Sequence, residues 1–248
     1  MSLFGRPLAD GDRLEVAGAV VRLKVHARAR RVSLRLDRTR REVVATAPSL
    51  RRLGEAAAFA TERAGWITAR LAELPQGQII APGLTLNLFG GACILEAATH
   101  PARFFPATED QPARIGARGE GQAYGRAVMR VLKAQALATF QARTVHHCQQ
   151  LGTRLPTVTV MDARGRWGSC RQGLPGRAAS IRYSWRLALA PFEVADYVVA
   201  HECAHLLEAN HGPAFWGHVK TLVGDERPHR AWLRTHGASL HAFGSDAP

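Results

Sequence analysis

Apolar and polar residues alternate near the start of the chain in the pattern of β-strands. Between residues 31 and 37, Val32, Leu34 and Leu36 are separated by polar residues, as in a strand with one buried face. The same character extends over residues 13–47, and the polar stretch at 37–41 predicts a hairpin loop. We therefore expect the chain to begin with a small sheet.

Helical spacing follows this first sheet. Ser49 can cap a helix, and apolar residues at spacings of three and four continue to about residue 74. A further pair of strands is expected at 79–88 and 92–97, because Gly90-Gly91 marks a turn between two apolar runs. The first hundred residues therefore read as β-rich with one helix.

The second half of the chain has more helical pattern. Apolar residues at spacings of three and four predict a long helix over 121–151. The remaining elements are expected as strands at 157–161 and 178–187, a helix from Pro191 to about Asn210, and short helices at 213–223 and 226–236. This order of helices and strands indicates an α+β protein.

Residues 99–119 interrupt both patterns. They contain prolines at 101, 106 and 112 and glycines at 116 and 119, so we interpret them as a linker. The expected organisation is an N-terminal β-rich subdomain with one helix at 1–98, the linker at 99–119, and a C-terminal core at 120–248.

The composition is that of a globular protein with a strong positive charge. The 248 residues are 46% hydrophobic and carry 33 Lys+Arg against 20 Asp+Glu, a formal net charge of +13. Such a balance is compatible with an anionic or nucleic-acid partner. It is equally compatible with a bias towards arginine codons, because net charge does not determine fold.

Membrane and secretory signals are missing from the sequence pattern. No apolar run approaches the ~18 residues of a membrane span, and the N-terminal residues lack the apolar core of a signal peptide. The four cysteines are scattered and form no CxxC pair. We therefore expect a cytoplasmic protein with reduced thiols and no membrane partner.

Residues 201–205 read His-Glu-Cys-Ala-His on a predicted helix. Residues four apart share one helix face, so His201 and His205 can bind a single tetrahedral Zn²⁺. Glu202 projects from the edge of that face, where it can take a proton from zinc-bound water. The spacing therefore predicts a hydrolytic metal site with one zinc ion per chain.

A site of this kind needs a third protein ligand. His211 follows His201 by ten residues, just beyond the predicted helix end, and a turn at 210–212 can return it to the metal. Glu208 lies on the same helix about 10 Å from His201 along the axis, too far to complete the site. His218 and Asp225 are weaker alternatives.

An ordered set of motifs resembles a known family. The motifs are GRWGSC at 165–170, IRYSWRL at 181–187, DYVVAHECAHL at 196–206, Asn-His at 210–211 and Phe-Trp at 215–216. Together with Ala47-Pro48 and Gly-Trp-Ile at 65–67, they resemble the YgjP-like metallopeptidase family over most of the chain. That family is similar to the minimal zincins and related to the WLM and SprT-like proteases.

The resemblance implies a fold and a set of roles. The fold would be α+β, with a zincin-like helix–strand–HExxH-helix core at 120–248 beside the β-rich N-terminal subdomain. Zinc would be bound by His201, His205 and His211, with Glu202 as the general base. Two positions depart from the family pattern, since Cys203 stands where Leu is usual and Ser184 where Asn is usual.

Four residues are weaker candidates for substrate binding. Arg166 can hold an anionic group, and Trp167 can form a wall of the cleft, although packing in the core is the alternative for this tryptophan. Tyr183 or Tyr197 can polarise a substrate carbonyl. The strand at 180–185 can pair with an extended peptide if it lies at a sheet edge.

The favoured function is a zinc metallopeptidase that cleaves peptide or protein substrates. A nucleotide pyrophosphatase that uses the same metal site is an alternative, because a metal motif does not fix the substrate. Arg164, Arg166, Arg171 and Arg182 favour an anionic or nucleotide ligand. A nucleic-acid-associated protease is a second alternative, motivated by the basic residues between Arg22 and Arg41.

Overall fold

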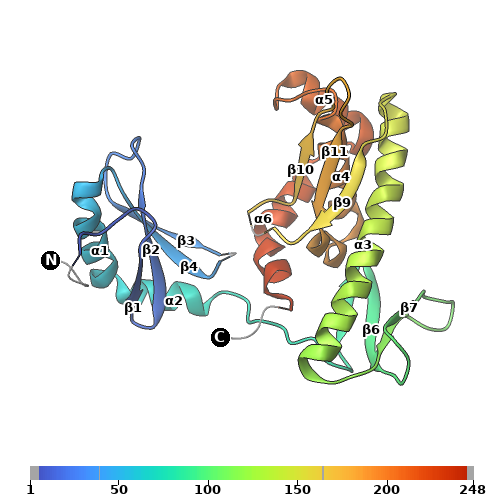
Figure 1. The fold of residues 1–248 in the computed structure, drawn as a ribbon, viewed down its shortest axis with the longest axis horizontal. Coiled ribbons are helices and arrows are strands. Elements are labelled where there is room, and N and C mark those ends of the chain that lie inside the picture. The colour runs from blue at the N-terminus through green and yellow to red at the C-terminus, as the bar shows by residue number, and fades with distance from the viewer. Residues whose placement is uncertain (1–5, 39, 164, 245–248) are drawn as a thin grey trace. The chain divides into compact units, whose positions relative to one another are not determined.

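The computed structural model describes residues 6–38, 40–163 and 165–244. The chain divides into two compact units, Met1–Gln76 and Gly77–Pro248. Each contains helices and sheets, so the predicted α+β class is confirmed (Figure 1). Among the described residues, none of the helices combines the length and hydrophobicity that a membrane span requires.

The N-terminal unit is a four-stranded sheet covered by helices. Strands β2 and β4 are parallel neighbours at its centre, and β1 and β3 pair antiparallel at the two edges. The elements are β1 (Arg13–Val16), β2 (Ala19–Val25), β3 (Ser33–Asp37), β4 (Glu42–Ala47), the 3₁₀ turn η1 (Leu50–Arg52), α1 (Leu53–Glu62) and α2 (Ala64–Ala72). Ala17 and Gly18 both have positive φ, as the tight β1–β2 hairpin requires.

The single helix expected up to residue 74 is divided into α1 and α2. Arg63 leaves helical geometry at φ −100° and ψ 20°, and its amide bonds to the carbonyls of Phe59 and Ala60. Helix α1 buries three alanines, whose small side chains allow it to lie close to the sheet. Helix α2 buries Ile67.

The C-terminal unit begins with a second four-stranded sheet in the order β5-β6-β8-β7. Its strands are β5 (Thr85–Leu88), β6 (Gly91–Ala97), β7 (Arg103–Phe105) and β8 (Ala113–Ala117). The expectation of a linker at 99–119 is therefore wrong. Strand β8 pairs in parallel with β6, and Ile115 is buried in the same core as the helices that follow.

The boundary of the units also differs from the sequence prediction. It falls between Gln76 and Gly77, before β5, instead of at residue 98. Pro106 and Pro112 lie in the loop between β7 and β8, so these prolines mark a connection within a sheet. Short strands separated by proline do not differ from a linker in composition.

The long helix α3 (Gly121–Leu151) packs against several of the elements that follow it, and it has the predicted bounds. It ends at Gly152, whose positive φ of 66° suits a left-handed cap. Beyond it lie β9 (Thr157–Met161), β10 (Gly168–Arg171), β11 (Ser180–Ser184), the 3₁₀ segment η2 (Trp185–Leu189), α4 (Phe192–Ala204), α5 (Pro213–Val223) and α6 (Arg227–Ala242). Figure 1 shows α3 running beside β9 and α4.

Candidate metal centre

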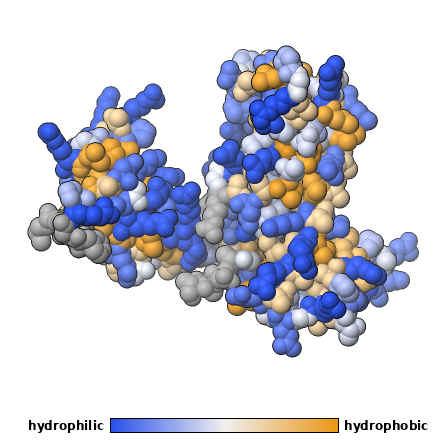
Figure 2. Space-filling view, in the orientation of Figure 1, coloured by the Kyte–Doolittle hydropathy of each residue, from blue (hydrophilic) through white to orange (hydrophobic). Residues whose placement is uncertain are grey.

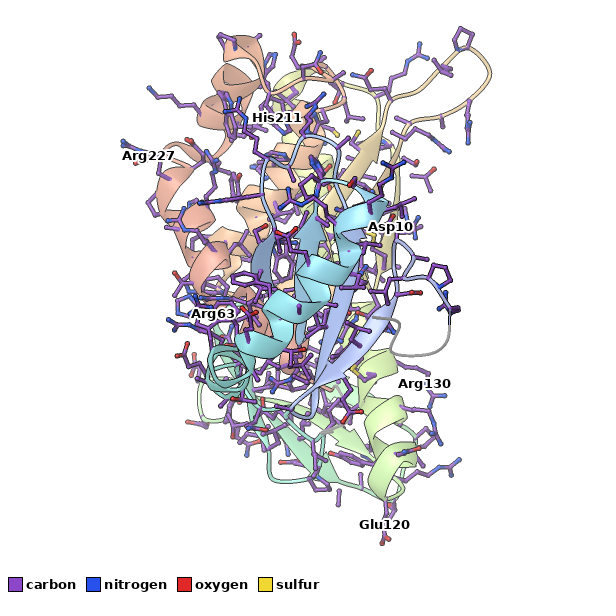
Figure 3. All side chains as sticks on the ribbon, turned by 90° about the vertical axis from the view of Figure 1, so that its left-hand side faces the viewer. Asp10, Arg63, Glu120, Arg130, His211 and Arg227 are labelled. Atoms are coloured by element: carbon purple, nitrogen blue, oxygen red, sulfur yellow. The ribbon has the colours of Figure 1, made fainter. Side chains whose placement is uncertain are left out.

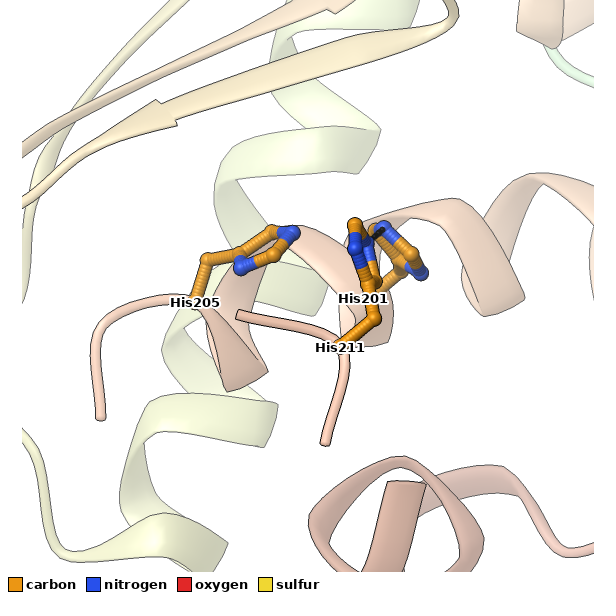
Figure 4. Close-up of side chains that lie close together, drawn as sticks. All are labelled: His201, His205 and His211. Carbon is orange, nitrogen blue, oxygen red and sulfur yellow. Dashed lines mark hydrogen bonds between the residues drawn. The ribbon is translucent and has the colours of Figure 1, made fainter. Parts of the chain in front are cut away.

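Three histidines meet at the end of α4. His201 lies in its last turn, His205 is the residue that ends it, and His211 comes from the loop before α5. One nitrogen from each of the three lies within 4.8 Å of the other two. The closest pair is His201 Nε2 and His211 Nε2, at 3.1 Å (Figure 4). Residues of the helix end and of the loop that follows it are thus brought to one point.

The helix ends earlier than the sequence suggests. It was expected to run to about Asn210, but helical structure stops at Ala204 and the chain continues in turns. The Nδ1 atom of His205 lies 2.9 Å from the carbonyl oxygen of Glu208 and closes this turn. The chain reverses sooner than predicted, which brings His211 back beside His201.

The hydrogen bond at His205 fixes its tautomer. A carbonyl oxygen only accepts, so Nδ1 carries the proton and Nε2 keeps its lone pair. Burial, followed by the charges of His205 and His211, lowers the pKa of His201 to about 3, so this ring is neutral. Neutral imidazole is the form that binds a metal ion.

The donor set fits a zinc ion. Two nitrogens bound to one tetrahedral zinc at about 2.0–2.1 Å lie about 3.3 Å apart, close to the 3.1 Å between His201 Nε2 and His211 Nε2. Three imidazoles are also ligands that zinc prefers. These histidines could therefore hold such an ion.

Aromatic side chains of α5 pack against the three histidines. The Phe215 ring is fully buried, and its centroid lies 4.8, 4.5 and 4.6 Å from those of His201, His205 and His211. Trp216 lies 5.8 Å from His211 on the same helix. This packing limits rotation of the imidazoles and excludes water from one side of them.

Glu202 is buried beside the first residue of β10. Its side chain packs against the backbone of Gly168, where an added Cβ would lie 2.6 Å from Glu202 Cγ and 2.7 Å from Cδ. Side-chain atoms do not approach this closely, so a Cβ at this position would have to displace the Glu202 side chain. Burial raises the pKa of Glu202 to about 7, while the charge of Arg166 acts in the opposite direction. The carboxylate is therefore able to bind a proton near neutral pH.

A comparison with protein families agrees with this arrangement of histidines and glutamate. The model of the YgjP-like metallopeptidase domain matches residues 30–236, which is most of the chain. The chain belongs to the YgjP-like metallopeptidase family. Comparisons with curated proteins and with solved structures gave no match. Membership in this family gives the protein a metal-dependent peptidase domain and implies a metal ion, which is typically zinc in such enzymes.

A second polar cluster on α4 was not found from the sequence. Asp196 accepts hydrogen bonds from Arg143 Nε and Nη2 at 2.7 and 3.0 Å, and its Oδ1 lies 2.8 Å from His147 Nε2. His147 is fully buried. Burial raises the pKa of Asp196, but the bonds from His147 and Arg143 outweigh this and lower it. The cluster ties α4 to α3.

Arg166 and Trp167 are neighbours in the loop before β10, but their side chains lie in different surroundings. Arg166 is exposed, and its charge reaches Glu202. The Trp167 ring stacks on His241 with centroids 4.7 Å apart and packs against Gly237 of α6. Trp167 therefore packs between elements, as the alternative for this residue anticipated. Arg164 lies outside the described residues.

The two candidate tyrosines, Tyr183 and Tyr197, also lie in different surroundings. Tyr183 is fully buried, and its hydroxyl lies 2.9 Å from Thr144 Oγ1, so the expectation that it meets a substrate is wrong. Its strand, β11, is the middle strand of the sheet β10-β11-β9 and has no free edge for a peptide. Tyr197 is nearly buried and contacts His201 edge-on at 6.0 Å.

The alternative ligands do not join the cluster. Among the described residues, only His201, His205 and His211 form a group of three that could hold a metal ion. Glu208 contributes its backbone carbonyl to His205. Asp225 pairs with Arg227 at 2.8 Å.

Proposed function

We propose that this protein is a zinc peptidase in which His201, His205 and His211 hold the metal and Glu202 acts as the general base. The observation that carries the proposal is the convergence of three imidazole nitrogens at the end of α4, the helix that also carries the buried Glu202. The helix α3, the sheet β10-β11-β9 and α4 would then form a zincin-like core.

The chemistry divides between the metal and the chain. A zinc ion held by the three imidazoles would supply Lewis acidity toward a carbonyl and would lower the pKa of water to near neutral. Glu202 takes a proton from the attacking water as its oxygen bonds to the carbonyl carbon. When the carbon–nitrogen bond breaks, Glu202 returns that proton to the departing amine. A carboxylate with a pKa of about 7 is suited to both transfers.

The substrate would lie along β10. This strand is at the edge of its sheet, and its first residue, Gly168, lies against Glu202. A free edge can pair with an extended peptide through backbone hydrogen bonds, which suits recognition of many sequences. Arg166 would meet an acidic group beside the cleaved bond, and Tyr197 would border the site next to His201.

The Glu202→Gln variant tests the proposal. It should keep one zinc per chain by elemental analysis and lose about 10²–10⁴-fold in hydrolysis of denatured casein. The matched control is Glu208→Gln, since Glu208 contributes only its backbone carbonyl. Stoichiometric zinc together with full activity in Glu202→Gln would reject the proposed role.

The alternative substrates are separated in the same experiment. Phosphate release from a panel of nucleoside triphosphates would identify a pyrophosphatase that uses this site. Neither the structure nor the family match supports a nucleotide or nucleic-acid partner. The basic residues near the N-terminus are partly neutralised, because Arg22 bonds to the buried Glu42 at 2.7 Å and Arg13 and Arg40 also lie within 4 Å of it.

A further inference from the structure

The N-terminal unit contains an open groove that the proposed catalysis does not use. Its volume is about 520 Å³. Residues 31–34 form one side, where the chain enters β3, and Phe59, Arg63 and Trp66 of the α1–α2 segment form the other. Every lining residue belongs to this unit.

One side of the groove is a free sheet edge. Strand β3 is the last strand in the order β1-β2-β4-β3 and pairs only with β4. Within the described residues, no backbone bond joins its other edge to another segment. Every second residue of such an edge directs its N–H and C=O groups outwards, and these groups can pair with an extended peptide.

The other side offers an exposed aromatic surface. The Trp66 side chain is 38% exposed at the start of α2, and Phe59 is partly buried beside it. Leu34 faces the helices from β3 and is also partly buried. Figure 2 shows hydrophobic side chains at the surface of this unit around α1, bordered by hydrophilic ones. An apolar side chain that entered the groove would therefore leave water.

The charges at the groove are all positive. Of the residues that the structure describes, Arg31 and Arg63 line it and no acidic residue does. Arg63 lies at the junction of α1 and α2, with its guanidinium 5.6 Å from the Phe59 ring centroid (Figure 3). On β3 the exposed Ser33 and Arg35 alternate with the partly buried Leu34. The strand therefore presents a basic side chain, Arg35, on the face opposite to Leu34.

We propose that this groove binds an extended peptide segment in which apolar and acidic residues alternate. The segment would pair with the free edge of β3 as an added strand. Its apolar side chains would lie between Leu34 and Trp66. Its carboxylates would point to the opposite face and meet Arg35, while the charges of Arg31 and Arg63 at the groove would add attraction for the negatively charged segment. The site would recruit a protein partner independently of the candidate metal centre.

A peptide fits this surface better than a nucleic acid does. The free edge supplies directional backbone hydrogen bonds, which a peptide can match along its whole length. Phosphate recognition would need a continuous track of unpaired cations. Arg22, which lies on the open face of the same sheet, is instead bonded to Glu42.

Fluorescence anisotropy of the 248-residue chain tests the proposal. The probe is a labelled decapeptide of alternating valine and glutamate, compared with the matching valine–lysine peptide and with a short oligothymidylate. The valine–glutamate peptide should bind, and the valine–lysine peptide should bind at least about tenfold more weakly. Two further peptides are N-methylated at all valines or at all glutamates. At least one of them should lose binding, because N-methylation blocks pairing along one edge.

Variants locate the binding. Arg63→Glu and Trp66→Ala should each weaken binding about tenfold or more, and both residues are exposed enough for the fold to survive. Arg51→Glu, a charge reversal at an exposed arginine outside the groove, should change it less than about twofold. Melting curves of the variants check that each is folded. The proposal is overturned if the acidic peptide does not bind, if Arg51→Glu weakens it as much as Arg63→Glu, or if only the oligonucleotide binds.

Discussion

Asp196 and Glu202 are two shielded carboxylates on the same helix, and their surroundings move their pKa values in opposite directions. Burial raises the pKa of Asp196, but the bonds from His147 and Arg143 outweigh burial and lower it. Burial raises the pKa of Glu202 to about 7, and the more distant charge of Arg166 only reduces this effect. One carboxylate holds α4 against α3, and the other remains able to take up a proton.

The contrast shows how the fold positions a reactive group. A buried carboxylate with a cationic partner stabilises the folded state, whereas one without a close partner opposes burial in its charged form. The helix therefore carries its stabilising and its reactive carboxylate at separate positions. The following substitutions test this division, from the largest expected effect to the smallest.

Asp196→Asn should lower the free energy of unfolding by about 3–4 kcal/mol, because Arg143 and His147 lose their shared anionic acceptor. Urea unfolding followed by tryptophan fluorescence measures this, since every tryptophan except Trp66 lies in the C-terminal unit. In the matched control, Asp225→Asn removes an exposed ion pair and should leave the unfolding free energy nearly unchanged. Equal losses in both variants would contradict the structural role of Asp196.

The contribution of Asp196 to the free energy of unfolding depends on pH in a definite direction. Because the pKa is lowered in the folded state, the contribution is present above the ordinary value of 3.8. It is lost as the pH falls through the lower folded value. The difference in stability between the wild type and Asp196→Asn should therefore be constant near neutral pH and shrink in acid.

Glu202→Gln should have the opposite effect on the metal-free chain. The raised pKa means that the wild type loses stability as the pH rises from the ordinary value of 4.5 through about 7. A neutral glutamine avoids this loss, so the variant should be more stable by about 3 kcal/mol at about pH 8 and equal to the wild type near pH 4. Unfolding curves in the presence of a chelator measure the difference. A less stable variant at alkaline pH would mean that Glu202 has an unrecognised partner.

Gly168→Ala should reduce kcat/KM by about 10–100-fold, because a Cβ at this position displaces the Glu202 side chain. Zinc content should stay unchanged, which separates displacement of Glu202 from loss of the metal. Gly165→Ala is the matched control, since a Cβ there meets open space. Full activity in Gly168→Ala would show that the position of Glu202 does not limit the reaction.

Tyr183→Phe should have the smallest effect, about 1 kcal/mol in the free energy of unfolding, through loss of the hydrogen bond with Thr144. Peptidase activity should change by less than about twofold, because the hydroxyl is buried away from any substrate. A large fall in activity without a fall in stability would restore Tyr183 as a catalytic candidate.

Local spacing predicted much of the catalytic half of the chain. The apolar periodicity gave the bounds of α3, and the i, i+4 spacing placed His201 and His205 on one helix face. His211 lies with them, as expected from a turn after the helix. Binding of zinc by these residues stays a prediction. These features depend on residues close together in sequence, where helix geometry alone sets the distances.

Long-range pairing could not be predicted in the same way. The alternation around Tyr183 indicates a strand, but it does not show that β10 and β9 occupy both of its edges. His147 lies on the long helix α3 and is buried because α4 covers that face and supplies Asp196, which the spacing within α3 does not show. Gly168 carries no signal of its role until Glu202 is seen beside it.

The most direct test of the central claim is anomalous X-ray diffraction at the zinc absorption edge from crystals of the purified chain. We expect one peak per chain, about 2.0–2.1 Å from one imidazole nitrogen each of His201, His205 and His211, with the Glu202 carboxylate beside it. A zinc peak bound elsewhere, or zinc-loaded crystals with no peak at these three histidines, would contradict the claim.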